Sequence, residues 1–204
     1  MSNALYIKAS CVISRETVYT NDVAVYGLPG AALPDFLQGA YQFFGCNYPK
    51  FHKMDNLGKL GFLASELVLR PSEMERYAPA DRGIVLANAN ASLDTDLKYY
   101  ETVHAIASPA LFVYTLPNIV IGEISIRNQF KGENAFFVFN GFDATFMHGY
   151  VTNLFANNLV QVCVCGWIDV LDDQYKAVLL LIEKEKPHTE ELFTPENFNK
   201  IYQL

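Results

Sequence analysis

The chain has 204 residues and a mass of 22.9 kDa; 51% of the residues are hydrophobic and 18% are charged. This length and composition fit one well-buried domain and exclude an intrinsically disordered protein. The share of charged residues is below the roughly 25% that is typical of soluble domains. We therefore expect an unusually large share of the surface to be buried, by the fold itself or by a partner.

The charge balance is acidic, with 15 Lys and Arg against 22 Asp and Glu and a net charge of -7. No run of Lys or Arg is present that would neutralise a line of phosphates, so nucleic acid is excluded as a partner. Residues 1–14 lack the pattern of a signal peptide, and a cytoplasmic protein is expected. The uncharged stretches 105–122 and 144–168 are interrupted by prolines or polar residues, and no membrane span is expected.

The four cysteines are unevenly placed, which predicts reduced thiols rather than a disulfide framework: Cys11, Cys46, Cys163 and Cys165. Cys163 and Cys165 alternate with valines, so in a strand both side chains face the same way. A metal site would need a second Cys or His pair at ligand spacing, and none accompanies them. We expect core packing, with no metal and no cofactor.

The first half of the chain predicts two strands and three helices. A strand is expected over 5–13, a short helix over 34–41, and a longer helix from the N-cap Asp55 to about Leu69. A buried strand follows over 83–87. Ser92 caps a helix over about 93–107, with Asp94 and Asp96 in its first turn, where the helix dipole favours carboxylates.

The second half predicts helices alternating with strands, which indicates an α/β fold. An apolar helix begins at Leu116-Pro117 and ends at Gly132. A strand over 135–139, a turn at Asn140-Gly141 and the cap Asp143 lead into an uncharged helix over 144–156. Strands follow over 160–166 and 175–183. The uncharged helix should be buried all round, with another subunit as one possible cover.

The chain is predicted to be one domain, residues 1–185, with a C-terminal tail, residues 186–204. Thr194 and Pro195 are a helix start, with Thr194 as the N-cap and Pro195 at the first helical position. The tail contains three aromatic residues that could pack on the surface of the domain: Phe193, Phe198 and Tyr202.

Several segments, in their order and spacing, resemble the amino-terminal half of a β-ketoacyl synthase, which has the thiolase fold. The matching segments are Phe51-His52-Lys53-Met54-Asp55 with 59–64, Thr115 to Ile126, Lys131-Gly132-Glu133-Asn134, Cys165-Gly166-Trp167 with Asp169, and Tyr175 to Lys184. The resemblance implies a thiolase-like half with a mixed central sheet, a buried nucleophile-type helix and flanking helices. It also implies that the strand over 135–139 pairs across a dimer axis.

The chain departs from the family at the catalytic residues. Counted from Gly132, the position of the family's active-site cysteine falls on Gly141, and without a thiol no acyl-enzyme forms there. The family's two catalytic histidines belong to its carboxyl-terminal half, and His52, His104, His148 and His188 match neither motif. His148 is expected to be a satisfied core histidine rather than a displaced base.

A ketosynthase-like subunit without its nucleophile resembles a chain-length factor, and a half-length version resembles those of aryl polyene-type pathways. The resemblance implies a heterodimer with a full-length, cysteine-bearing ketosynthase, whose acyl tunnel this chain helps to shape. The candidate tunnel or interface residues are five phenylalanines and one asparagine in the turn: Phe136, Phe137, Phe139, Asn140, Phe142 and Phe146. Acyl carrier proteins are acidic, as this chain is, so carrier docking is expected mainly on the partner.

Two alternatives remain open. One is a stand-alone, homodimeric acyl-binding module of the same fold, in which the phenylalanines are ordinary core or dimer packing. The other is an acyltransferase or hydrolase that uses His148 or Cys165 at a rearranged site. A mid-strand thiol in apolar surroundings has a raised pKa, which disfavours Cys165 as a nucleophile.

Overall fold

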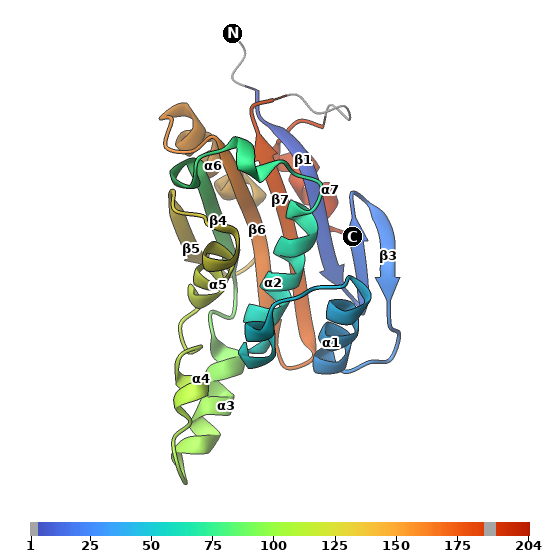
Figure 1. Cartoon of the computed structure of the whole chain (residues 1–204), viewed down its shortest axis with the longest axis vertical. Helices are drawn as coiled ribbons and strands as arrows, with labels where there is room; N and C mark the ends of the chain where they lie inside the picture. Colours follow the sequence, from blue (N-terminus) through green and yellow to red (C-terminus); the bar gives the residue numbers. More distant parts are fainter. Residues whose placement is uncertain (1–3, 186–190) are drawn as a thin grey trace.

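The computed structural model of the chain describes residues 4–185 and 191–204. One seven-stranded sheet runs through it in the order β3-β2-β1-β7-β6-β4-β5 (Figure 1). The strands are β1 (Tyr6–Ser14), β2 (Thr17–Thr20), β3 (Val23–Gly27), β4 (Arg82–Asn88), β5 (Asn134–Val138), β6 (Val162–Leu171) and β7 (Gln174–Glu183). The α-helices are α1 (Leu33–Phe43), α2 (Asn56–Leu69), α3 (Leu93–Val103), α4 (Pro109–Phe112), α5 (Ile119–Asn128), α6 (Ala144–Ala156) and α7 (Pro195–Tyr202).

The sheet is the middle of three layers. Helices α1, α2 and α5 cover one face, and α6 and α7 cover the other (Figure 1). Side chains alternate along the strands between the two faces, so each face has its own apolar cluster. On β6, Val164 belongs to the cluster under α2, whereas Cys163 and Cys165 belong to the cluster under α6. The expected orientation of the two thiols is confirmed.

The sheet is mixed, as expected. Strand β4 pairs in parallel with β5 on one side and with β6 on the other, whereas β6 and β7 are antiparallel. Strand β4 is buried over 83–88, which explains its continuous apolar sequence. Strand β5 lies at the edge of the sheet, and among the described strands it pairs with β4 alone.

Three helix starts follow the capping signals of the sequence. Asp55 accepts a hydrogen bond from the backbone N–H of Gly58 at 2.8 Å and begins α2. Asp143 accepts from the N–H of Phe146 at 2.9 Å, and α6 has the predicted bounds. Thr194 accepts from the N–H of Asn197 at 3.2 Å, with Pro195 in the first turn of α7. These contacts satisfy N–H groups that have no partner inside a helix.

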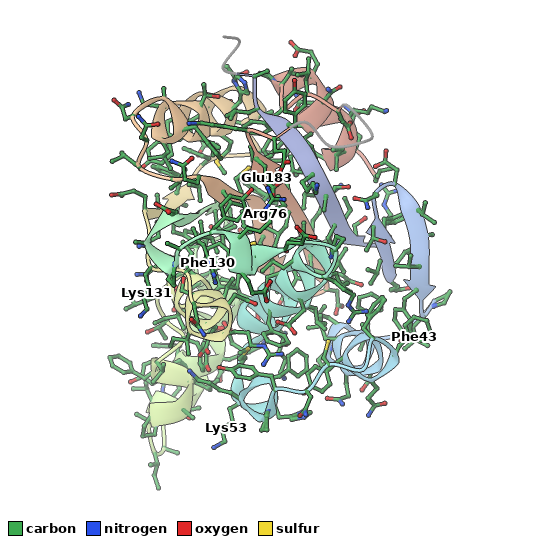
Figure 2. All side chains as sticks on the ribbon, turned by 45° about the horizontal axis from the view of Figure 1, so that its top comes forward. Phe43, Lys53, Arg76, Phe130, Lys131 and Glu183 are labelled. Atoms are coloured by element: carbon green, nitrogen blue, oxygen red, sulfur yellow. The ribbon has the colours of Figure 1, made fainter. Side chains whose placement is uncertain are left out.

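Two predicted helix ends are wrong. Helix α3 ends at Val103, before residue 107, because Ser108 begins the separate helix α4 and accepts a hydrogen bond from the N–H of Leu111. Helix α5 ends at Asn128, before Gly132, because Gln129 takes a left-handed conformation with φ of 56°. After this turn Phe130 is buried and Lys131 is exposed (Figure 2).

Strands β2 and β3 were not predicted. They form a hairpin whose two turn residues, Asn21 and Asp22, have φ of 48° and 65°. Two consecutive left-handed residues make the type I′ turn that suits the twist of paired strands. The sequence signal that was missed is the Asn21-Asp22 pair between two short segments in which apolar and polar residues alternate.

Helix α6 is not buried all round within this chain. One side packs on the sheet through Met147, Val151 and Phe155, while the other side is exposed at Gly149 and Asn153. The outward residues are small or polar apart from Phe146, and the described residues provide no further layer over them. The absence of charged residues from α6 therefore does not correspond to full burial of the helix within this chain.

Among the residues that the structure describes, no helix is long and apolar enough to cross a membrane.

Candidate functional site

The turn that carries Gly141 lies at the carboxyl end of β5. The backbone N–H of Phe139 donates to the carbonyl oxygen of Asn88 at the end of β4, at 2.9 Å. Asn140 and Gly141 are exposed, and Asp143 then begins α6. Ligands of α/β proteins commonly bind at the carboxyl ends of parallel strands, so the turn occupies a favourable position for a site.

Gly141 has no side chain, so position 141 of the turn offers no nucleophile. A Cβ atom built on it would have no heavy atom within 4 Å beyond its chain neighbours. The open depression above it is lined by residues 139–145 and by Asn199 from α7. A side chain at position 141 would therefore project into free space, and the glycine is not required by crowding.

The five candidate phenylalanines separate into three groups. Phe137, Phe139 and Phe146 form one cluster. The ring centroid of Phe146 lies 4.9 Å from that of Phe137 and 5.0 Å from that of Phe139. Phe136 points to the opposite face of the sheet, where it packs on the cluster under α2. The alternation of side chains along β5 separates Phe136 from its neighbours, although all are adjacent in sequence.

Phe142 belongs to a third group, held by the C-terminal helix. Its ring stacks on Tyr202 with centroids 4.0 Å apart and meets Phe198 edge-on at 4.9 Å. It also lies edge-on to Trp167 of β6 at 5.9 Å. The tail aromatics dock on the domain as the sequence predicted, and they fix the residue that follows Gly141.

A hollow of about 420 Å³ lies beside the turn, and it was not predicted. Ala89, Gly141, Asp169 and Lys176 are among its lining residues. Asp169 accepts hydrogen bonds from the backbone N–H groups of Ala89 and Asn90, at 3.2 and 3.0 Å. These residues come from four separate segments, and only the strand order brings them together.

His148 lies between a threonine hydroxyl and an aromatic ring. Its ring is half-buried on α6, with Nε2 3.5 Å from Oγ1 of Thr152 and its centroid 5.1 Å from the ring of Phe193. This is packing at the α6–α7 junction rather than burial in the core. His52 and His104 contact aromatic rings elsewhere, and His188 lies outside the described residues.

The thiols of β6 are sealed inside the protein. Cys163 and Cys165 are 0% exposed, and burial raises the pKa of both. The thiolate is the nucleophilic and metal-binding form, and it is disfavoured in both residues. Among residues 4–185 and 191–204, no group of three or more His, Cys, Asp or Glu is arranged to hold a metal ion.

Thiol labelling tests this assignment. In the folded protein we expect iodoacetamide at pH 8 to alkylate Cys163 and Cys165 at least 100-fold more slowly than in denaturant, because reaction needs an exposed thiolate. A Gly141→Cys variant should add one thiol that reacts rapidly in the folded protein. All three positions lie in the single tryptic peptide 132–176, so fragmentation of that peptide by tandem mass spectrometry measures each site. Rapid native alkylation of Cys165 would contradict its burial and restore it as a candidate nucleophile.

Comparisons with known proteins identify the fold. No protein-family model and no curated protein matches this sequence significantly. Three similar solved structures involve ketosynthases. The first is a type II PKS acyl-carrier protein in complex with its ketosynthase (AntDE:AntF), with a TM-score of 0.65 and 13% identity over 88% of this chain and 62% of that chain. The second is the ishigamide ketosynthase/chain length factor, with a TM-score of 0.64 and 14% identity over 88% and 62% of the two chains.

The third is a ketosynthase (ApeO) in complex with its chain length factor (ApeC) from Xenorhabdus doucetiae, with a TM-score of 0.57 and 11% identity. It aligns over 98% of this chain and 90% of that chain. By contrast, this chain spans 62% of the length of each of the first two matches, less than two thirds. The chain therefore has the ketosynthase-like α/β fold that its sequence segments predicted.

Proposed function

We propose that this chain is a non-catalytic, ketosynthase-like subunit of the chain-length-factor type. The proposal rests on Gly141, which the sequence resemblance assigns to the family's nucleophile position and which lies in the exposed turn between β5 and α6, while the thiols of β6 are buried. The match to one chain of the ApeO–ApeC complex over 90% of that chain supports it, since a chain of nearly this size takes part in such an assembly.

The proposed partner is a full-length ketosynthase that carries the active-site cysteine and performs decarboxylative condensation on carrier-bound acyl groups. Edge strand β5 is the proposed contact, because no strand of the described residues pairs with its outer N–H and C=O groups. Acyl carrier protein would dock mainly on the partner, as charge suggests.

The proposed tunnel wall comprises three of the five candidate phenylalanines. Phe137, Phe139 and Phe146 form a cluster next to the open depression, and Phe146 is 39% exposed. Phe142 is engaged by α7 and Phe136 faces α2, so both suit packing roles. The depression is open on its outer side, so a second wall from a partner would be needed to enclose an acyl chain.

Product length tests the wall. Replacing Phe146 with alanine removes a phenyl ring from the proposed end of the tunnel, and one methylene in an apolar pocket is worth roughly 1 kcal/mol. We expect the complex with the ketosynthase to release longer products, measured by mass spectrometry of the released acyl chains. Phe136→Ala is the matched control from the same segment, and a shift with Phe136→Ala but not with Phe146→Ala would contradict the assignment.

Assembly tests the subunit role itself. The chain would be co-expressed with a full-length, cysteine-bearing ketosynthase and analysed by size-exclusion chromatography with light scattering. A stable one-to-one complex is expected. Separate species, with a ketosynthase that is active alone, would contradict the proposal, and a homodimer of this chain would favour the acyl-binding module.

A further inference from the structure

Two basic side chains line the hollow beside Gly141. Arg15 comes from the turn between β1 and β2, and Lys176 comes from β7. Neutral hydrogen-bond donors line the same hollow, among them Gln174 and Tyr202. The whole chain has a net charge of -7, so two cations at one hollow are contrary to its overall charge.

Neither cation has an acidic partner among the described residues, because none of their ion pairs includes Arg15 or Lys176. Lys176 is half-buried, and its ammonium lies 4.5 Å from the centroid of the Tyr202 ring. Burial and the positive charge of Arg15 lower the pKa of Lys176. Both effects disfavour the charged lysine, and an anion bound beside it would oppose both.

The carboxylates nearest to the two cations are engaged by other donors. Asp169 lies opposite the lysine in the register of β6 and β7. It accepts from the backbone N–H groups of Ala89 and Asn90, at 3.2 and 3.0 Å, and from the Asn90 side chain at 2.7 Å. Glu16 accepts from the backbone N–H of Gly30 at 2.7 Å. The donors of the two cations are therefore left for another acceptor.

The turn that carries Arg15 has an uncommon conformation for its residues. Arg15 and Glu16 have φ of 47° and 58°, between the paired strand ends Ser14 and Thr17. Two left-handed residues in a two-residue hairpin make a type I′ turn, which favours asparagine and glycine. Charged residues in this conformation are uncommon, and such strained positions gather at functional sites. The turn thus holds an arginine where the backbone alone favours a smaller residue.

Hydrogen bonds fix this turn beside the hollow. The backbone N–H of Glu16 donates to the hydroxyl of Tyr175, which also lines the hollow, at 2.9 Å. The carbonyl oxygen of Glu16 accepts from the N–H of Leu28 at 3.0 Å, and that of Arg15 accepts from the Thr17 hydroxyl at 3.2 Å. The backbone of Arg15 is therefore positioned without a ligand, which lowers the ordering cost of binding one.

The donors around the hollow suit a phosphate group. An arginine offers a planar fork and a lysine a compact charge, and both recognise phosphate. A phosphate group has three strong acceptor oxygens, so it can accept from both cations and from a neutral donor such as Gln174 or Tyr202. The hollow, of about 420 Å³, falls within the range of small-molecule sites.

We propose that this hollow is a phosphate-binding site, with Arg15 and Lys176 as its two cationic contacts. The inference goes beyond the proposed function and does not depend on it, because the residues that form the site all belong to this chain. The phosphate is either free or the end of an apolar ester. Gly141 also lines the open depression at the turn, so an ester held in the hollow would extend into that depression.

Isothermal titration calorimetry of the full chain tests the site with two probes, inorganic phosphate and octyl phosphate. Sodium chloride at equal ionic strength is the blank, because exposed surface charges respond to any salt. Lys176→Met and Arg15→Asn each remove one cation from the hollow. Lys131→Met is the matched control, because it removes the same charge as Lys176→Met at the end of β5 opposite Gly141.

The Arg15→Asn variant separates ligand binding from folding. Asparagine adopts the left-handed conformation more readily than arginine. We therefore expect this variant to melt at or above the wild-type temperature by circular dichroism, although it loses a contact to phosphate. A loss of binding in a protein that is at least as stable as wild type has no explanation in unfolding.

We expect saturable one-to-one binding by wild type and Lys131→Met, and at least tenfold weaker binding by Lys176→Met and Arg15→Asn. Tighter binding of octyl phosphate would assign the site to phosphate esters with an apolar tail, and equal binding of the two probes would assign it to free phosphate.

Two results would overturn the inference and leave the proposed subunit role standing. One is the lack of saturable binding of either probe by wild type, and the other is equal affinity in Arg15→Asn and wild type. The second result decides the matter even where Lys176→Met fails to fold. Failure to form a complex with a ketosynthase would contradict the proposed function alone and leave the phosphate site standing.

Discussion

Replacing Phe198 with alanine is expected to lower the free energy of unfolding by about 3–5 kcal/mol, the usual cost of removing a fully buried phenyl ring. Phe198 is 0% exposed in α7 and lies edge-on to Phe142 at 4.9 Å and 5.9 Å from Phe193. Its loss would leave a cavity between α7, α6 and the sheet. Urea unfolding monitored by circular dichroism measures the change as a lower midpoint at constant slope.

Lys200→Ala is the control, because Lys200 is an exposed residue of the same helix and alanine favours helix. Its effect should stay within about 0.5 kcal/mol. If Phe198→Ala cost no more than Lys200→Ala, α7 would be a dispensable appendage, and the stacking of Tyr202 on Phe142 would not stabilise the Gly141 turn.

Elements with both a cap and a strong apolar run were predictable from the sequence. Helix α6 has the predicted bounds because Asp143 can accept from a backbone N–H at its start and Asn157-Asn158 follows its last apolar residue. Helix α7 has no apolar run, and its start was predictable from the Thr194-Pro195 cap alone. Caps are local chemistry, so a short stretch of sequence contains all that determines them.

The β2–β3 hairpin was missed because its strands are short and partly polar. The preceding turn, between β1 and β2, is built by Arg15 and Glu16 with φ of 47° and 58°. Charged residues seldom adopt this conformation, and the sequence gives no sign of the turn there. The hairpin is stabilised by pairing with β1, a contact made possible only by the completed sheet.

The place of Gly141 in the fold was predictable, but the grouping of the five phenylalanines was not. Segment order placed Gly141 between β5 and α6, where it lies in the structure. The five phenylalanines were grouped because they are close in sequence, whereas strand alternation and α7 separate Phe136 and Phe142 from the rest. The exposure of the apolar side chains of α3 was not predictable, because an apolar helical stripe looks the same in sequence whether it faces the core or the surface.

Replacing Gly166 with alanine is expected to abolish stable folding. A Cβ atom there would lie 1.9 Å from the carbonyl oxygen of Val178 in the neighbouring strand β7. Backbone atoms cannot move aside without parting the central strands β6 and β7, so the loss should exceed about 4 kcal/mol, a range reserved for severe packing faults. Soluble yield and thermal melting by circular dichroism measure the effect.

Gly141→Ala is the control that separates crowding from the general effect of adding a methyl group. Position 141 has free space around its Cβ and is not among the glycines with positive φ. Alanine there should leave stability unchanged or raise it by about 0.4–1 kcal/mol, because it restricts the unfolded chain. A marked loss with Gly141→Ala would show that the turn itself requires glycine, and the glycine would then no longer support the proposed non-catalytic role. Equal tolerance of both substitutions would contradict the close approach of β6 to β7.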